Sequence, residues 1–175
     1  MTTTNDAPVR IVPYDPSWPL SFETERAALA SLLAPWLAGP IEHVGSTAVP
    51  GLAAKPVIDI MVGVGGLEAS RPALAELPRL GYCHFPYRAE VMHWFCKPSP
   101  AFRTHHLHLV PWKSQLWRDR IAFRDLLRAR ADVAADYAEL KRRLAADHEF
   151  DREAYTDAKT PFVERALGMV EGRRS

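Results

Sequence analysis

One carboxylate and two imidazoles in this sequence have a spacing that suits the binding of a cation. Asp59 is the one acid in the apolar run VIDIMVGV, and His106 and His108 stand two residues apart in THHLHLVPW. Because side chains of a strand alternate between its faces, both histidines project from one face, and Asp59 projects from the face opposite its apolar neighbours. Two imidazoles and a carboxylate can hold a divalent cation. The alternative is that the histidines only hydrogen-bond to carboxylates and that Asp59 ties down the loop before it.

A second group of residues suits the binding of an anion. The segment 45–56 is rich in glycine and proline and contains Gly45, Ser46, Thr47 and Lys55. Glycine permits a tight turn, hydroxyls and successive backbone N–H groups can surround a phosphate, and the lysine adds a positive charge. The alternative is an ordinary turn with a solvated lysine. If these segments meet on one polar face, that face would hold a cation and a phosphate group together.

Three residues outside these segments are further candidates for ligand binding. Tyr155 and Lys159 are four residues apart in a helical region and so share a face, and Arg103 directly precedes the histidine segment. The alternative for Tyr155 and Lys159 is a packed ring with the lysine stem lying along it. The basic run at 141–143 indicates a solvated helix face.

A mixture of strands and helices is predicted to carry these candidates. Apolar residues recur at helical spacing near the N-terminus and again after residue 112, and short β-rich segments lie between. The predicted helices include about 17–36, 67–79, a stripe through Val133, Tyr137, Leu140 and Leu144, and 151–171 with a break at Thr160 and Pro161; the predicted strands are 41–44, 57–64, 82–86, 91–97 and 104–112. Because strands do not alternate regularly with helices, the sequence predicts an α+β fold: a mixed, twisted β-sheet with flanking helices and a helical C-terminal part.

Composition narrows the setting in which these residues act. The chain has 175 residues, of which 47% are hydrophobic and 25% charged, and its formal net charge is +1. A nearly neutral chain has no general attraction to nucleic acid or to a membrane, and the polar opening MTTTNDAPVR is not a signal peptide. Cys83 and Cys96 make no disulfide framework. We therefore expect a cytoplasmic protein with a flexible tail at 1–8; the sequence indicates no particular oligomeric state.

Long motifs of the chain resemble the GrpB family. They are VPYDPSWPLSFETE, HVGSTAVPGLAAKPVIDIMVGV, THHLHLVPW, FRDLLRARADVAADYAELKRRLA and YTDAKTPFV, and the resemblance covers roughly residues 9–170. It implies a single domain with a fold similar to the nucleotidyltransferase superfamily, of the polymerase-β type. In that domain an α/β core at 9–112 would precede a helical part at 113–172.

The resemblance also implies roles for individual residues. In the superfamily, a Gly-Ser turn is followed by a strand with two acids at positions i and i+2, which hold divalent metals. Gly45 and Ser46 match the turn and Asp59 matches the first acid, so the resemblance implies catalytic roles for Ser46 and Asp59. The second acid falls on Met61, which cannot bind Mg²⁺, and a histidine of the HxH pair stands where a third acid is expected. Mg²⁺, Mn²⁺ and Zn²⁺ are all candidates, and a set of one carboxylate and two imidazoles favours the softer ions.

Three hypotheses on function follow. The first is an enzyme that transfers a nucleotidyl or phosphoryl group with the help of the cation. The second is a module that binds a nucleotide or phosphorylated metabolite without catalysis, which the methionine at position 61 favours. The third is an interaction or folding-assistance protein, as has been suggested for GrpB domains fused to dephospho-CoA kinase. The polar residues gathered around Asp59 argue against the third hypothesis, and the chain contains no P-loop that would imply kinase activity.

Overall fold

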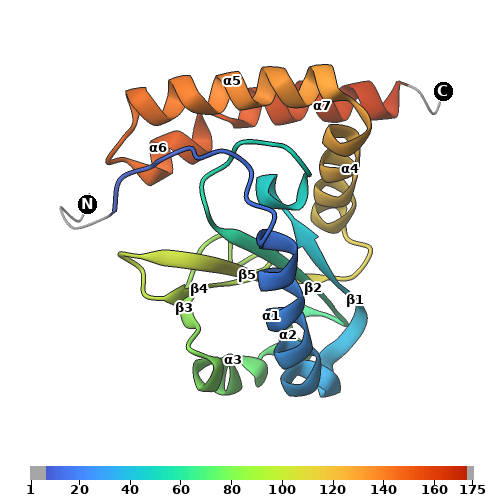
Figure 1. Ribbon diagram of the computed structural model, residues 1–175. Coiled ribbons are helices and arrows are strands. Elements are labelled where there is room, and N and C mark those ends of the chain that lie inside the picture. The colour runs from blue at the N-terminus through green and yellow to red at the C-terminus, as the bar shows by residue number, and fades with distance from the viewer. Residues whose placement is uncertain (1–6, 173–175) are drawn as a thin grey trace.

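A five-stranded mixed β-sheet forms the centre of the computed structural model, which describes residues 7–172 (Figure 1). The strands are β1 (Leu37–Val44), β2 (Ile58–Val64), β3 (Cys83–Phe85), β4 (His93–Pro98) and β5 (Arg103–Pro111). Their order across the sheet is β1-β2-β5-β4-β3; β2 and β5 run parallel, and the other neighbouring strands run antiparallel. The predicted α+β fold with a mixed sheet is confirmed. The strand of Asp59 and the strand of the two histidines are direct neighbours.

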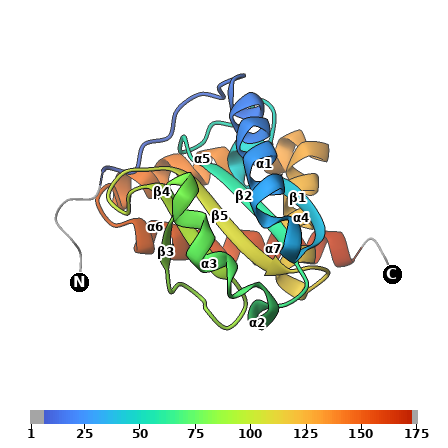
Figure 2. The same ribbon diagram turned by 90° about the horizontal axis from the view of Figure 1, so that it is seen from below.

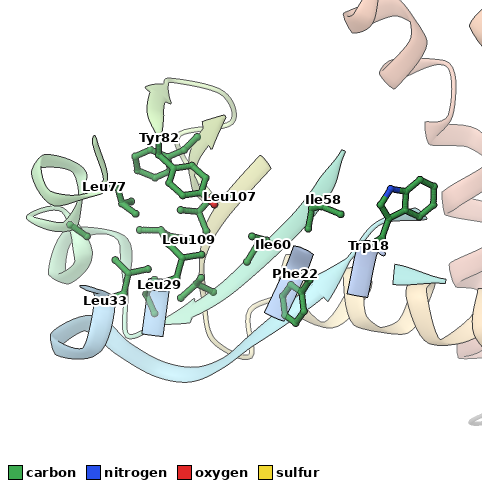
Figure 3. Packing of buried hydrophobic residues seen from close by; sticks show 14 of the residues in the cluster. Trp18, Phe22, Leu29, Leu33, Ile58, Ile60, Leu77, Tyr82, Leu107 and Leu109 are labelled. Carbon is green, nitrogen blue, oxygen red and sulfur yellow. The ribbon is translucent and has the colours of Figure 1, made fainter. Parts of the chain in front are cut away.

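One face of the sheet is covered by α1 (Trp18–Leu33) and by the short helices α2 (Leu67–Ser70) and α3 (Ala73–Glu76) (Figure 2). Apolar residues one turn apart on α1 meet the alternate apolar residues of the two central strands. The buried side chains of this layer include Trp18, Phe22, Leu29, Leu33, Ile58, Ile60, Leu107 and Leu109 (Figure 3). The core face of β2 is therefore the predicted one, and Asp59 points to the other side.

Prolines divide the segment that follows β2. The prediction of one helix at 67–79 is wrong, because α2 and α3 are separate and a 3-10 turn follows at Leu77–Leu80. Pro72 and Pro78 lack the backbone N–H that a continuous helix needs, and their rings clash with the preceding turn. Three short pieces therefore close this side of the core.

Two boundaries near the N-terminus also differ from the prediction. The first helix ends at Leu33, and a 3-10 turn at Ala34–Trp36 leads directly into β1. β1 begins at Leu37, ahead of Pro40, and is longer than expected. An edge strand tolerates this proline because its outer side needs no N–H donor. Residues 1–6 of the predicted tail lie outside the described residues, and the backbone N–H of Ala7 donates to the carbonyl of Ala101.

The last third of the chain forms four helices on the other side of the molecule (Figure 1). They are α4 (Gln115–Ala129), α5 (Ala131–Asp147), α6 (Arg152–Asp157) and α7 (Thr160–Glu171). Val49 and Leu52, in the loop between β1 and β2, are buried in one apolar cluster with residues of α4, α5 and α7. The helical part is thus fixed to the loop that carries Gly45 and Ser46. This contact brings α5 and the α6–α7 junction toward the polar face of the sheet.

Lys141 is buried, so the prediction of a solvated face for 141–143 is wrong at this residue, whereas Arg142 and Arg143 are exposed as predicted. Its side chain is 2% exposed, its Nζ donates to the carbonyl of Ala53 at 2.5 Å, and it lies 4.8 Å from the ring centroid of Tyr137. Burial, followed by the charges of Lys159 and Arg142, lowers the pKa of Lys141 to about 7. The buried lysine fastens α5 to the loop between β1 and β2.

The protonation of Lys141 should make the stability of the protein depend on pH. The folded pKa of about 7 lies below the ordinary lysine value of about 10.4, so between these values the unfolded chain binds a proton that the folded chain lacks. The free energy of unfolding should therefore rise with pH in this window, by up to about 1.4 kcal/mol per pH unit. Urea unfolding at pH 7, 8 and 9 should show a smaller rise in Lys141→Met than in the wild type. Equal rises in the two proteins would contradict the assignment.

No helix within residues 7–172 has the length and apolar character needed to cross a membrane.

Candidate functional site

The pairing of β2 with β5 places Asp59 beside the two histidines, on the face of the sheet opposite α1. Asp59 is level with His106 in the parallel register, and Met61 is level with His108. Asp59 Oδ1 lies 3.0 Å from His106 Nδ1 and 3.5 Å from His108 Nε2. One ligand atom from each of the three residues lies within 4.8 Å of the others. The structure therefore brings the three predicted residues together, and we call them the triad.

The protonation states of the triad suit metal binding. Burial alone would raise the pKa of Asp59, but hydrogen bonds with His106 and His108 hold it well below its ordinary value. Burial lowers the pKa of His106, and burial followed by the charge of Arg120 lowers the pKa of His108 to about 3. At neutral pH the site is one carboxylate with two neutral imidazoles. Carboxylates coordinate metals in the ionised form and histidines in the neutral form.

The spacing of the triad atoms also fits a metal. An ion held tetrahedrally at about 2.0–2.1 Å from each ligand separates the ligand atoms by roughly 3.3 Å, close to the two distances from Asp59 Oδ1. The far nitrogens, His106 Nε2 and His108 Nδ1, are buried without a hydrogen-bond partner among the described residues. The ring of Trp94 packs against His106 with 5.1 Å between centroids. The imidazole of His106 is therefore oriented by Asp59 and by the packing of Trp94, and not by a hydrogen bond to its far nitrogen.

The Gly-Ser turn lies directly against Asp59. Gly45 has φ 73° and ψ −173°, a conformation that is essentially restricted to glycine. A Cβ at this position would stand 2.4 Å from Asp59 Oδ2. Ser46 follows at the start of a 3-10 turn; burial raises the pKa of Tyr137 of α5, and the nearby side chain of Ser46 opposes this shift. The turn therefore closes one side of the carboxylate, and only glycine allows this close approach.

Thr47 does not present its hydroxyl to the triad, in contrast to the prediction that it binds ligand. Its side chain is buried, its Oγ1 donates to the carbonyl of Val57 at 3.1 Å, and the same oxygen lies 2.9 Å from His43 Nε2. The residue lines a separate cavity of about 420 Å³ between α1, β1 and α4. Two acids of that cavity are already paired, Glu23 with Arg26 and Glu42 with Arg124. The hydroxyl of Thr47 therefore holds the turn in place.

Two predicted lysines gather around one tyrosine ring beside the triad. Lys55 Nζ is 5.9 Å and Lys159 Nζ is 4.2 Å from the ring centroid of Tyr155, which is 1% exposed. Burial and the charge of Lys55 lower the pKa of Lys159 to about 8, and the charge of Asp59 opposes this shift. The charges of the two lysines therefore repel each other, and Lys159 is attracted by the charge of Asp59. Tyr155 is a packed ring, as the alternative prediction held, and it supports both cations.

Arg103 lies against Trp94, the ring that packs on His106. Its guanidinium is 5.2 Å from the ring centroid of Trp94, and its Nε donates to the carbonyl of Pro100 at 2.8 Å. The charges of Lys55 and Arg103 are among the causes that lower the pKa of His106. Both predicted cations therefore act on the His106 end of the triad.

Two residues of this region were not among the predicted site residues. Tyr137 was placed only in a helical stripe, and the structure has it buried, with the side chain of Ser46 close enough to lower its pKa against the effect of burial. Arg120 lies on α4, and its charge acts on both Asp59 and His108. Its spacing from Trp117 was the available signal, because residues three apart on a helix share a face and Trp117 is buried.

Comparisons with known proteins agree on one family. The model of the family described as GrpB protein matches residues 8–168. A UPF0157 protein of Pseudomonas aeruginosa is 42% identical, covering 95% of this chain and 69% of that protein. The glutamate-rich protein GrpB of Alkalihalophilus pseudofirmus is 33% identical, covering 97% of this chain and 100% of that protein.

Two further matches are with a longer protein and with a solved structure. A protein named dephospho-CoA kinase, from Mycolicibacterium paratuberculosis, is 32% identical and covers 91% of this chain, but this match includes only 45% of that protein. The crystal structure of the conserved protein GrpB from Enterococcus faecalis superimposes with a TM-score of 0.84 at 32% identity, covering 94% of this chain and 99% of the other. The predicted resemblance is confirmed in sequence and in fold, and the chain belongs to the GrpB family.

Proposed function

We propose that the protein binds a nucleotide or another phosphorylated metabolite together with a divalent cation held by Asp59, His106 and His108. The observation that carries the proposal is the convergence of Asp59 Oδ1, His106 Nδ1 and His108 Nε2 at ligand spacing. One oxygen and two nitrogen donors suit Zn²⁺ or Mn²⁺ better than Mg²⁺, which prefers oxygen.

The surroundings of the triad support an anionic ligand. Lys55 and Lys159 bring two positive charges to the ring of Tyr155, the charge of Asp59 acts on Lys159, and the Gly45–Ser46 turn lies against the same carboxylate. Two cations in a partly buried site repel each other. A phosphate group that binds between them offsets this repulsion, so its binding is favourable. We therefore assign the phosphate of the ligand to the space between the turn and these lysines.

Binding is the first candidate and group transfer the second. Met61 occupies the place of a second metal-binding acid, and it is fully buried in an apolar cluster with Val44, Met92 and Trp117. A two-metal reaction therefore has no second carboxylate on β2. A single divalent ion, when bound, would polarise a phosphoryl oxygen, and Ser46 and Asp59 would be the catalytic residues of such a transfer. Kinase activity is not part of the proposal, since the match to dephospho-CoA kinase covers under half of that protein.

The test is a titration of the metal-free protein with Zn²⁺, Mn²⁺ and Mg²⁺ by calorimetry, followed by thermal unfolding with ADP and ATP. We expect one ion per chain and an affinity for Zn²⁺ or Mn²⁺ at least ten-fold above that for Mg²⁺. A nucleotide at about 100 times its Kd should raise the Tm by roughly 5–10 °C, and only with the ion present. No ion uptake, or equal shifts with and without the ion, would refute the proposal.

A further inference from the structure

Cys83 and Cys96 lie directly opposite each other on neighbouring strands. Both are free thiols, and Cys83 is level with Cys96 in the antiparallel pairing of β3 with β4. Residues that face each other in an antiparallel pair have Cα atoms roughly 4.5–5.5 Å apart. A disulfide joins residues whose Cα atoms are about 4.4–6.8 Å apart. The fold therefore holds the two thiols at a separation that a disulfide bond can span.

The two side chains also share one face of the sheet. Cys96 is fully buried in the apolar cluster that includes Met61 and Trp94, and Cys83 packs against this cluster. Cys83 Sγ lies 3.7 Å from the carbonyl oxygen of Pro98, so its sulfur leans across β4. Because opposite residues of a strand pair direct their Cβ atoms to the same side, a rotation of the side chains brings the two sulfurs together while the strands stay in place.

The two thiols differ in their access to solvent. Cys83 is half-buried on β3, the strand at the edge of the sheet (Figure 1), whereas Cys96 is fully buried. A reagent from solution therefore reaches Cys83 first. Cys96 lies behind it, where it can react with the sulfur of Cys83 but not with a dissolved molecule. An accessible thiol that reacts first and a neighbouring thiol that resolves the product are the two parts of a redox-active cysteine pair.

We propose that Cys83 and Cys96 form a thiol–disulfide exchange site, at which a low-molecular-weight disulfide oxidises the two thiols to a bond between β3 and β4. The Cys83 thiolate attacks one sulfur of the small disulfide, whose S–S bond breaks, and a first small thiolate leaves. Cys96 then loses its proton to solvent and attacks the Cys83 sulfur of the mixed disulfide, and the second small thiolate leaves. The two protein sulfurs give up two electrons to the small disulfide, and the two released thiolates take up the two protons. The exchange needs neither the cation nor the phosphate of the proposed function.

The new bond would lie beside the triad. Cys96 is level with His106 in the pairing of β4 with β5, and the ring of Trp94 packs on the same imidazole. Phe85 of β3 lies 6.1 Å from Trp94 between ring centroids. Oxidation would therefore tie the edge strand to β4 next to the rings that pack on His106.

The test uses hydroxyethyl disulfide as the oxidant on the full chain, followed by intact mass and a free-thiol assay. The wild type should lose both thiols and two hydrogen atoms. The crosslinked chain should exceed the mixed disulfide at least ten-fold, because attack within the chain outcompetes a second molecule from solution. Dithiothreitol should restore both thiols. Backbone amides of β3 should exchange with solvent at least ten-fold more slowly after oxidation, since a covalent bond then holds the edge strand.

Two variants and one condition separate positioning by the fold from the reactivity of thiols in general. Cys83→Ser should leave Cys96 as an unreacted thiol. The double variant Cys83→Ser/His84→Cys moves the outer thiol by one residue to the opposite face of β3, at an exposed position. It should accumulate the mixed disulfide and form no crosslink. In concentrated urea, the ratio of crosslink to mixed disulfide in the wild type should fall at least ten-fold, because the strands no longer hold the thiols together.

Three results would overturn the proposed exchange site. One is a native wild type that keeps the mixed disulfide at Cys83 with Cys96 still a thiol. Another is an equal yield of crosslink in the double variant or in urea, since the fold would then not position the two thiols. The third is an unchanged exchange rate of the β3 amides after oxidation, which would mean that the bond does not join the folded strands. Metal titrations of the triad do not depend on these results, so the exchange site and the proposed function fail separately.

Discussion

Asp59→Asn is expected to reduce the affinity for the divalent ion by more than 100-fold. Asp59 supplies the one negative charge of the triad, and its Oδ1 is the atom shared by both histidine contacts. Asparagine has nearly the same shape, but its amide is neutral and a poor ligand. Loss of an outer partner of a metal ligand typically costs 10–100-fold in affinity, so loss of a charged ligand should cost more. Calorimetry with the ion that binds the wild type most tightly measures the effect.

The fold should survive this change. Asp59 lies on the polar face of β2, away from the apolar layer under α1, so we expect a change in the free energy of unfolding of about 1–2 kcal/mol at most. Asp136→Asn is the matched control, because it makes the same chemical change on an exposed position of α5. Should Asp59→Asn bind the ion as tightly as this control, the triad is not the metal site. Unfolding of the variant without any measurable ion binding in the wild type would make Asp59 a structural residue.

Gly45→Ala is expected to damage both stability and the metal site. Alanine would have to adopt φ 73° and ψ −173°, which costs about 1–3 kcal/mol for a residue other than glycine. Its Cβ would also stand 2.4 Å from Asp59 Oδ2, so the carboxylate must shift from the position in which it meets the two histidines. We therefore expect a loss of at least 2 kcal/mol in the free energy of unfolding and a fall in metal affinity of at least ten-fold.

Gly51→Ala separates the two causes. Gly51 has φ 79°, so alanine is strained there as well, but a Cβ at this position meets no atom within 4 Å. This variant should lose about 1–2 kcal/mol in stability from the backbone alone and keep the metal affinity of the wild type. Urea unfolding and calorimetry on both variants give the comparison. If the two glycine variants match in stability and in metal binding, the close approach of Gly45 to Asp59 has no functional consequence.

The alternation of side chains along strands predicted which faces of β2 and β5 carry the polar residues. It placed Asp59 opposite the apolar face of its strand and put His106 and His108 together, and the structure agrees. The neighbouring position of the two strands was beyond this reasoning, since strand periodicity gives faces and not partners. That the three residues bind a metal is still a prediction.

The predictions failed mainly for positively charged residues that are buried in the structure. Lys141 follows Tyr137 by four residues and so lies on the apolar stripe of α5, but its charge suggested a solvated position. In the structure, a carbonyl acceptor and a tyrosine ring compensate its burial. Arg120 was missed for the same reason. The divided segment at 67–79 was a different case, because Pro72 and Pro78 were visible and apolar spacing was given more weight.

Because the C-terminal helices are attached to the loop at 45–56, the site is completed only late in the synthesis of the protein. Asp59, His106 and His108 have all left the ribosome before α5 and α7, so the strands that carry them can pair while synthesis continues. Lys159 comes from the last part of the chain, and Tyr137 reaches Ser46 only when α5 docks on the loop. A nascent chain would therefore gain its cation ligands first and Lys159 last. Premature termination within α5 would leave an open half-site.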